Sequence, residues 1–187
     1  RRQRQMCIRD RTWTETDEAY EQALADFVSG VMNDKALMAD IGSFVARLLE
    51  PGRVNGLAQT LLKLTVPGVP DLYQGTELWS LSLMDPDNRR AVDFEKRRQM
   101  LDRLCGMPEP EEIMAEADEG LPKLWVVNRT LQLRAARPEL FATTSAYRPL
   151  VVQGGSEPEG SRSEAAVAFM RGDDMVVVAP RLTLRED

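Results

Sequence analysis

The sequence predicts a fold that mixes helices and strands: a helix-rich body to about residue 146, followed by the start of an all-β unit. Two observations predict this class. Apolar residues recur at helical spacing through most of the body, and from Tyr147 the apolar period changes from about 3.6 residues to about 2. The strands after Tyr147 are too few to close a sandwich, so the β unit is expected to be truncated.

Three helices are expected near the N-terminal end. The first follows an N-cap at Thr14, the second carries an apolar stripe from Leu37 to Leu49 and stops at Pro51-Gly52, and the third spans about residues 53–64. We interpret their apolar faces as core rather than as cofactor pockets. Before them, residues 1–11 form a basic tract without periodicity, where a disordered or foreign end is expected.

Residues 66–94 connect this helical region to the next one. Pro67, Gly68 and Pro70 disfavour helix, and Asp71 to Gln74 is predicted to form a short strand that Gly75 ends. A polar loop follows, rich in Asp, Asn and Arg. A strand that leads into a polar loop is the arrangement in which barrel enzymes place their sites.

Three more helices and three strands are expected downstream. Asp93 is predicted to cap one helix, Pro110 to begin a second that extends to about Asp118, and the third spans about residues 122–136. The predicted strands and their connections are Tyr147–Gln153, a loop at 154–163, and a hairpin of Ala165–Arg171 and Met175–Ala179 around Gly172-Asp173-Asp174.

Composition excludes several classes of function. With 30 acidic residues, 24 basic residues and a net charge of −6, the chain is not expected to bind nucleic acid. No apolar run approaches the roughly 20 residues of a membrane span, and no signal peptide is expected. Two cysteines favour a reducing, cytoplasmic location. Histidine is absent, so acid–base chemistry must fall to carboxylates, and neither a metal nor a cofactor is expected.

The polar loop and the residues before it offer the groups that bind a sugar. A sugar ring takes a flat aromatic partner for its C–H face and planar donors and acceptors for adjacent hydroxyls. The candidate substrate-binding residues are Tyr73, Gln74, Glu77, Trp79, Asp85, Asp87, Asn88 and Arg89. From the residues alone, a second interpretation stays open: Pro86-Asp87-Asn88 is an ordinary tight turn whose arginines pair locally.

Residues 61–94 closely resemble the C-terminal part of maltooligosyl trehalose synthases, members of the α-amylase superfamily (glycoside hydrolase family 13). The pattern Pro67-Gly68-x-Pro70-x-x-Tyr73-x-Gly75-x-Glu77 is similar to the last barrel strand across the superfamily. The run Asp85-Pro86-Asp87-Asn88-Arg89-Arg90 is similar to the trehalose-forming branch in particular, although Ala91 stands where that branch has proline. Residues 131–141 look like the last barrel helix, and residues 147–150 like the first strand of the C-terminal domain.

The resemblance implies an α/β fold in which residues 12–146 form the C-terminal portion of a (β/α)8 TIM barrel and residues 147–187 begin an all-β C-terminal domain. It implies intramolecular transglucosylation of a maltooligosaccharide, an isomerase activity in trehalose biosynthesis. The catalytic carboxylates are expected upstream, so the chain alone should be inactive and should need the N-terminal part of its own barrel as a partner. Asp85, Asn88 and Arg89 would contact sugar hydroxyls, while the other candidates would shape the wall.

Two alternatives remain beside the hypothesis that this chain is part of a maltooligosyl trehalose synthase. Another α-amylase-type hydrolase or transglucosidase would share the barrel strand pattern but give different products. A non-catalytic carbohydrate-binding or scaffolding module would have no barrel upstream.

Overall fold

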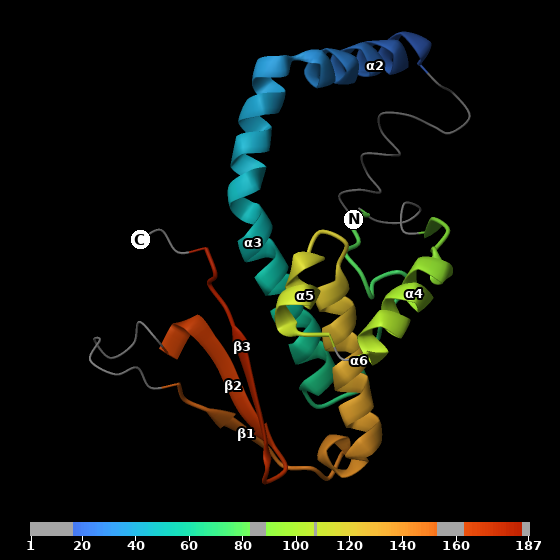
Figure 1. The fold of residues 1–187 in the computed structure, drawn as a ribbon. Coiled ribbons are helices and arrows are strands. Elements are labelled where there is room, and N and C mark those ends of the chain that lie inside the picture. Colours follow the sequence, from blue (N-terminus) through green and yellow to red (C-terminus); the bar gives the residue numbers. More distant parts are fainter. Residues whose placement is uncertain (1–16, 83–88, 107, 153–162, 185–187) are drawn as a thin grey trace. The chain divides into compact units, whose positions relative to one another are not determined.

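The computed structural model describes residues 17–82, 89–106, 108–152 and 163–184. The chain divides into two compact units, residues 1–49 and residues 50–187. Figure 1 shows the elements in chain order. In the residues that the structure describes, no helix is both long and apolar enough to cross a membrane.

The first unit contains helix α2 (Glu18–Asn33) and the beginning of α3 (Lys35–Thr65). Asp17 caps α2 by accepting a hydrogen bond from the Tyr20 amide at 3.1 Å, whereas the predicted cap, Thr14, lies outside the described residues. Asp34 caps α3 in the same way through the amides of Ala36 and Leu37, at 3.0 and 3.1 Å.

The apolar faces of this first unit are exposed. Phe27 is 68% exposed, Met32 61% and Phe44 61%, and no described residue of α2 is buried. For the described residues of this first unit, the prediction that the apolar stripes form a core is therefore not met. Contiguous apolar surface of this kind is typical of a face that further polypeptide covers, which agrees with the expectation that the chain is part of a larger body.

Helix α3 is continuous, so the prediction of two helices that meet at Pro51-Gly52 was wrong. A proline inside a helix removes one hydrogen bond and clashes with the preceding turn, at a cost of about 3 kcal/mol. A helix-forming run from Arg53 to Thr65 follows at once and keeps the chain helical beyond the proline. Buried residues on this part of α3 are Ala58, Thr60, Leu64 and Thr65.

The second unit adds helices α4 (Phe94–Cys105), α5 (Pro110–Ala115) and α6 (Leu121–Ala136) and the 3-10 turn η2 (Pro138–Phe141). Asp93 caps α4 through the Lys96 amide at 2.8 Å, as predicted. The helix from Pro110 ends at Ala115, earlier than expected. Buried residues from these helices and the preceding loop form one core cluster: Leu78, Met100, Leu104, Ile113, Leu121 and Leu124.

Three antiparallel strands follow in the order β1-β2-β3: β1 (Tyr147–Leu150), β2 (Ala166–Arg171) and β3 (Met175–Pro180), with the 3-10 turn η3 (Ser163–Ala165) before β2. The predicted hairpin is confirmed. Gly172 turns it at a φ of 57°, where glycine is favoured. Strand β1 ends at Leu150, before the predicted end at Gln153, and the loop expected at 154–163 lies almost wholly outside the described residues.

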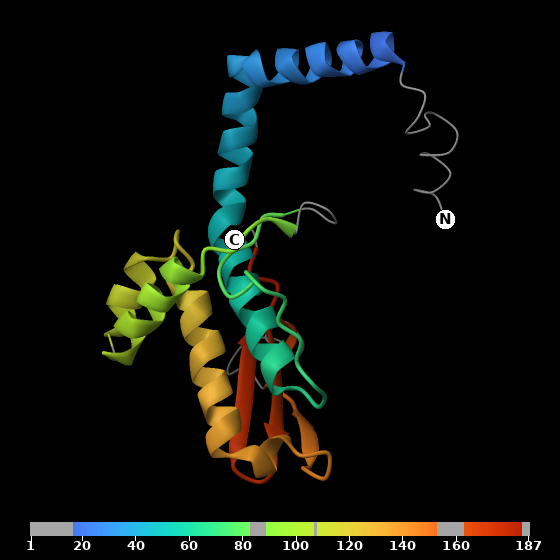
Figure 2. The same ribbon diagram turned by 90° about the vertical axis from the view of Figure 1, so that its right-hand side faces the viewer.

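The sheet lies along the C-terminal half of α3, as Figures 1 and 2 both show. The buried Arg171 of β2 donates from Nη1 to the Thr65 carbonyl at 3.2 Å, and Arg134 of α6 donates to the Leu64 carbonyl at 2.8 Å. Thr183, beyond β3, donates to the Pro51 carbonyl at 3.1 Å. Cations at a helix C-terminus are favourable, so the two arginines join α3 to the sheet and to α6. Burial lowers the pKa of Arg171, and the neighbouring Arg134 lowers it further.

The helices end at Phe141 and the strands begin at Tyr147, which is where the sequence changes period. That residue 146 is a domain boundary stays a prediction. Residues 71–74, expected to form a strand, are irregular in the structure, so that prediction was wrong. A strand needs neighbouring strands for its backbone hydrogen bonds, and among the described residues only β1, β2 and β3 form a sheet.

Candidate functional site

The segment after α3 is folded back on the residues that precede α4. Thr76 donates to the Tyr73 carbonyl through both its amide, at 3.0 Å, and its hydroxyl, at 2.6 Å, and so forms a turn. Gly75 lies within this turn. Its φ is 91°, and a Cβ on it would lie 3.2 Å from a methyl of Val92. The chain therefore needs glycine here for two reasons: its backbone conformation and the close approach of the second segment.

These two segments border a cavity of about 380 Å³, which we call the polar hollow. Its first flank is the segment 74–82, of which residues 74–75 and 79–82 line the cavity; its second flank is residues 90–93, and Arg97 of α4 completes the lining. The lining includes the amide residue Gln74, the hydroxyl residues Ser80 and Ser82, and the aromatic residue Trp79. Such a lining suits a polyhydroxylated ligand.

The predicted site residues divide into three groups in the structure. Gln74 and Trp79 line the polar hollow, while Tyr73 and Glu77 lie on the same segment outside its lining. Arg89 is exposed and directly precedes the second flank, outside the lining. The remaining candidates, Asp85, Asp87 and Asn88, lie outside the described residues.

Arg97, like Ser80 and Ser82, lines the polar hollow but is not among the residues that the sequence predicts for the site. It lies on the first turn of α4 with its side chain 16% exposed. Its Nε donates to Glu77 at 3.0 Å, Nη2 to the Gly75 carbonyl at 2.8 Å and Nη1 to the Asp93 carbonyl at 3.0 Å. Its spacing of four from the cap Asp93 is the one signal that could have found it, because that spacing directs a long side chain back over the helix N-terminus.

Trp79 is fixed from several sides. Its indole N–H donates to the Ala117 carbonyl at 2.6 Å, and its ring lies so close to Gly56 that a Cβ there would be 3.1 Å from it. The Lys123 ammonium lies 5.6 Å from the ring centroid and donates to the Leu78 carbonyl at 3.1 Å. Burial lowers the pKa of Lys123, and the nearby Lys63 lowers it further.

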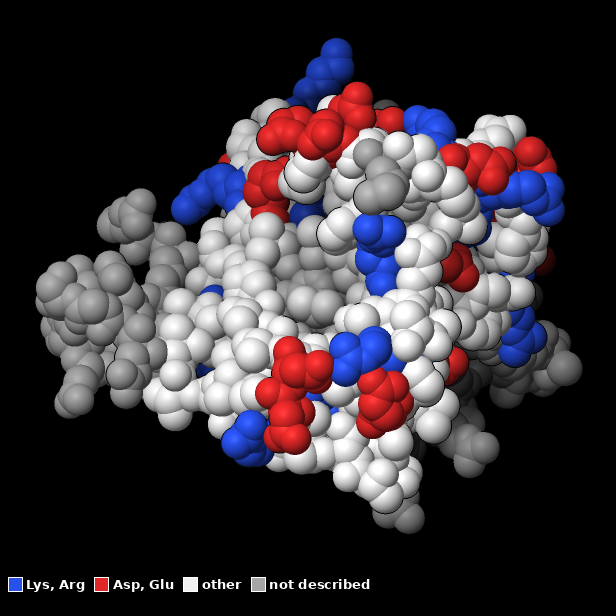
Figure 3. Space-filling model, turned by 60° about the horizontal axis from the view of Figure 1, so that its bottom comes forward, with Lys and Arg blue, Asp and Glu red and all other residues white. Residues whose placement is uncertain are grey.

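The turn between α5 and α6, which receives the Trp79 hydrogen bond, is itself held by ion pairs. Arg103 of α4 binds the Glu116 carboxylate with both terminal nitrogens, at 2.6 and 2.7 Å. Arg53 of α3 pairs with Asp118, and Lys96 of α4 pairs with Glu119. Figure 3 shows acidic and basic side chains next to one another on the face that it displays. The wall behind Trp79 is thus connected to α3 and α4.

Gly120 tests how tightly this turn packs against the Trp79 segment. Gly120 has a φ of 88°, and a Cβ on it would lie 3.1 Å from the backbone nitrogen of Trp79 and 3.3 Å from the Cα of Leu78. Gly120→Ala is expected to lower the free energy of unfolding by about 1 to 2 kcal/mol, because the conformation is unfavourable for alanine. Thermal unfolding of the protein measures it. Gly52→Ala in α3, where nothing lies within 4 Å of the added methyl, is the control and should not destabilise; equal losses would contradict the argument.

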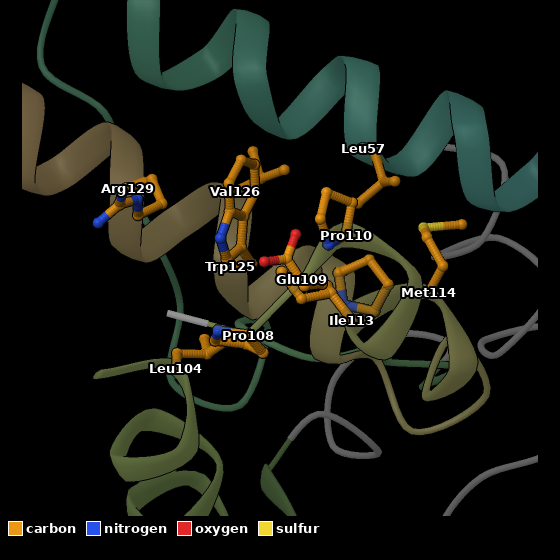
Figure 4. Close-up of a pocket in the computed structure, with 11 residues that line it drawn as sticks. Leu57, Leu104, Pro108, Glu109, Pro110, Ile113, Met114, Trp125, Val126 and Arg129 are labelled. Carbon is orange, nitrogen blue, oxygen red and sulfur yellow. The ribbon is translucent and has the colours of Figure 1, made fainter. Parts of the chain in front are cut away.

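A second cavity of about 400 Å³ lies among α3, α5, α6 and the segment before α5 (Figure 4). Figure 4 shows Leu57, Ile113, Met114 and Trp125 around it, with Glu109 and Arg129 as its charged groups. Glu109 is engaged in capping α5. The lining is mainly apolar and offers few free groups for sugar hydroxyls, so the polar hollow remains the better candidate despite its smaller volume.

The chemistry of the polar hollow is that of binding. Its described carboxylate, Asp93, already accepts a hydrogen bond from the Lys96 amide as a helix cap. In the part of the chain that the structure describes, no group of three or more Cys, Asp or Glu residues is arranged to hold a metal ion. The hollow can orient a ligand through Trp79, Gln74 and the two serines.

Comparisons with known proteins agree on one kind of relative. A protein of Mycobacterium tuberculosis (strain CDC 1551 / Oshkosh), named as a maltooligosyl trehalose synthase, is 38% identical over 181 residues, which is 95% of this chain and 21% of that protein. No protein-family model matches the chain.

Solved structures give the same result. The maltooligosyltrehalose synthase from Arthrobacter ramosus matches with a TM-score of 0.76 and 39% identity, over 93% of this chain and 21% of that one. A glycosyltrehalose synthase, DSM5389, matches with a TM-score of 0.64 and 32% identity, over 86% of this chain and 19% of that one. The resemblance stated from the sequence is confirmed: this chain is related in sequence and in fold to maltooligosyl trehalose synthases and spans about a fifth of their length.

Proposed function

We propose that this chain is part of a maltooligosyl trehalose synthase. The observation that carries the proposal is the agreement of sequence and fold: 38% identity over 95% of the chain, and a TM-score of 0.76 to a solved synthase. Within such an enzyme the helices would belong to the C-terminal portion of the (β/α)8 barrel, and the strands from Tyr147 would begin the C-terminal domain. The exposed thiol of Cys105 is compatible with the cytoplasmic location that this proposal includes.

The reaction proposed for the complete enzyme moves one glucosyl bond within the substrate. A carboxylate nucleophile takes the maltooligosyl chain as a glycosyl-enzyme, while a carboxylic acid protonates the departing terminal glucose. That glucose turns within the site, and its anomeric hydroxyl attacks the glycosyl-enzyme and returns its proton to the second carboxylate. The α-1,4 linkage thereby becomes α,α-1,1. These two carboxylates would come from the part of the enzyme upstream of this chain.

The role of this chain in the reaction would be to hold the sugar. A freed glucose must be kept from escaping and from being replaced by water, which calls for many specific hydrogen bonds around it. The polar hollow supplies a fixed aromatic wall, Trp79, beside the amide of Gln74 and the hydroxyls of Ser80 and Ser82. Arg89 lies next to the second flank, where its guanidinium could bind two adjacent hydroxyls at once.

Product analysis tests this function. The complete enzyme that contains this chain is incubated with a maltooligosaccharide, and the expected product has the same length but no reducing end. Glucose and shorter chains would instead indicate a hydrolase of the same superfamily, and an absence of turnover would favour a binding or scaffolding module. The isolated chain of 187 residues is expected to give no product.

Arg89→Ala addresses the predicted sugar contact. Losing a guanidinium that binds two hydroxyls is expected to lower turnover by about tenfold and to increase release of free glucose. Steady-state turnover and the ratio of glucose to rearranged product are measured together. Arg98→Ala is the control, since Arg98 is 67% exposed and pairs with Glu95 on the outside of α4. Unchanged turnover and unchanged glucose release in Arg89→Ala would remove Arg89 from the site.

A further inference from the structure

Arg97 touches both flanks of the polar hollow at once. On the first flank it donates to the Gly75 carbonyl and to the Glu77 carboxylate, and on the second to the Asp93 carbonyl, all between 2.8 and 3.0 Å. Its side chain is 16% exposed, and that of Glu77 is 26% exposed. A charged hydrogen bond that is shielded from water is stronger and better defined than one on the surface.

The chemistry of these contacts requires arginine. Three acceptors lie in three directions around one guanidinium, and arginine alone presents five N–H donors in a planar fork. A lysine ammonium is a compact charge on a flexible stem and would reach one or two of these oxygens at a time. Arg97 and the second flank also lie close to Gly75, since a Cβ at Gly75 would be 3.6 Å from Nη2 of Arg97 and 3.2 Å from a methyl of Val92.

Other arginines of α4 do not share this arrangement. Arg98 pairs with Glu95 one turn earlier on the same helix, with both side chains more than 60% exposed. Arg103 pairs with Glu116 at 51% exposure and is remote from the lining of the hollow. Arg97 is thus distinguished by its position at the hollow and by its two backbone carbonyl partners on opposite flanks.

We propose that Arg97 is a positioning residue of the polar hollow, which holds the flanks 74–82 and 90–93 at the separation needed to grip one glucose unit from both sides. The proposal rests on the proposed function. Arg97 would act through Gly75, Glu77 and Asp93 rather than by reacting with the sugar. When the flanks separate, a freed glucose escapes before it can attack the glycosyl-enzyme, so the ratio of released glucose to rearranged product rises.

The test uses the complete enzyme with Arg97→Lys, and Arg98→Lys as the matched control. Both changes preserve charge, and they lie next to each other on one helix. Arg97→Lys is expected to raise the ratio of free glucose to rearranged product by about tenfold, while Arg98→Lys leaves it unchanged. The melting midpoint is measured alongside, because a purely structural role of Arg97 would lower the midpoint and total turnover without altering the ratio of products.

The outcomes separate the two proposals. A wild-type enzyme that makes no rearranged product overturns the proposed function and this inference with it. A wild-type enzyme that makes the product, with an unchanged ratio in Arg97→Lys, overturns the role of Arg97 alone. If Arg97→Lys does not fold, Glu77→Gln takes its place, because it keeps an acceptor but removes the charge that holds Arg97. It should raise the ratio in the same direction, and an unchanged ratio overturns the role of Arg97.

Discussion

Phe169→Ala is expected to destabilise the sheet by about 3 to 5 kcal/mol, the cost of removing a fully buried aromatic side chain. Phe169 lies on the central strand β2 and is 0% exposed. Its ring centroid is 5.1 Å from that of Tyr147 on β1, at a tilt of 39°, and its Cα pairs with Val177 on β3. Arg171, two residues further along β2, joins this strand to α3, so loosening β2 should also weaken that junction.

Amide hydrogen exchange of β2 and β3 in the complete enzyme measures this effect locally, which avoids the assumption that a large enzyme unfolds in one step. Protection in these strands is expected to fall by more than about a hundredfold. Val178→Ala is the control, because Val178 lies on β3 and is 55% exposed, so its loss should change protection little. Phe169→Leu should recover most of the protection. Similar exchange in wild type and Phe169→Ala would show that the ring is not part of the core.

The fold was predictable from the sequence where the local residues are sufficient to determine the element. The hairpin around Gly172 depends on alternating apolar residues and a turn, and Asp93 precedes a helix as a cap does; both predictions are confirmed. Pro51 does not end the helix as predicted, because the helix-forming residues on either side outweigh the local effect of proline. The prediction of a strand at residues 71–74 was wrong because strand formation depends on partner strands that the local sequence does not reveal.

The spacing of apolar residues in α2 does not reveal that this helix is exposed in the chain. Its apolar period is that of a core helix, yet Phe27 and Met32 are mostly exposed. Periodicity tells which face seeks a partner, but not whether that partner belongs to the same segment. The chain spans about a fifth of the relatives that it matches, and the proposed enzyme would have further segments that can cover such faces.

The candidate site was predictable by residue type more than by geometry. Trp79 and Gln74 were selected as sugar-binding types and do line the hollow. Glu77 was selected for the same reason, but its carboxylate lies against Arg97, 20 residues further along the chain. Arg97 itself has no unusual neighbours in sequence. Its role comes from three acceptors that only the folded chain brings together.

Trp79→Ala is expected to have the largest effect on the proposed activity. Trp79 is partly exposed, so its loss should destabilise the fold by about 2 to 4 kcal/mol, less than a fully buried tryptophan would cost. The change removes the ring that packs on Gly56 and faces Lys123, and it leaves the Ala117 carbonyl without the indole donor. It also removes the aromatic side chain that we propose to stack on the sugar, and it loosens the first flank of the polar hollow.

Comparison of Trp79→Ala with Trp79→Phe separates the effect of the aromatic ring from that of the indole hydrogen bond to Ala117. Phenylalanine keeps an aromatic face but lacks the N–H that donates to Ala117, and the lost hydrogen bond should cost about 1 kcal/mol of stability. We expect Trp79→Ala to lower formation of the rearranged product by more than about hundredfold and Trp79→Phe by less than about tenfold. Trp125→Ala, at the second, mainly apolar cavity among α3, α5 and α6, is the control and should preserve the ratio of products. Equal activity in Trp79→Ala and wild type would show that this wall does not contact the sugar, and would leave the polar hollow without its aromatic partner.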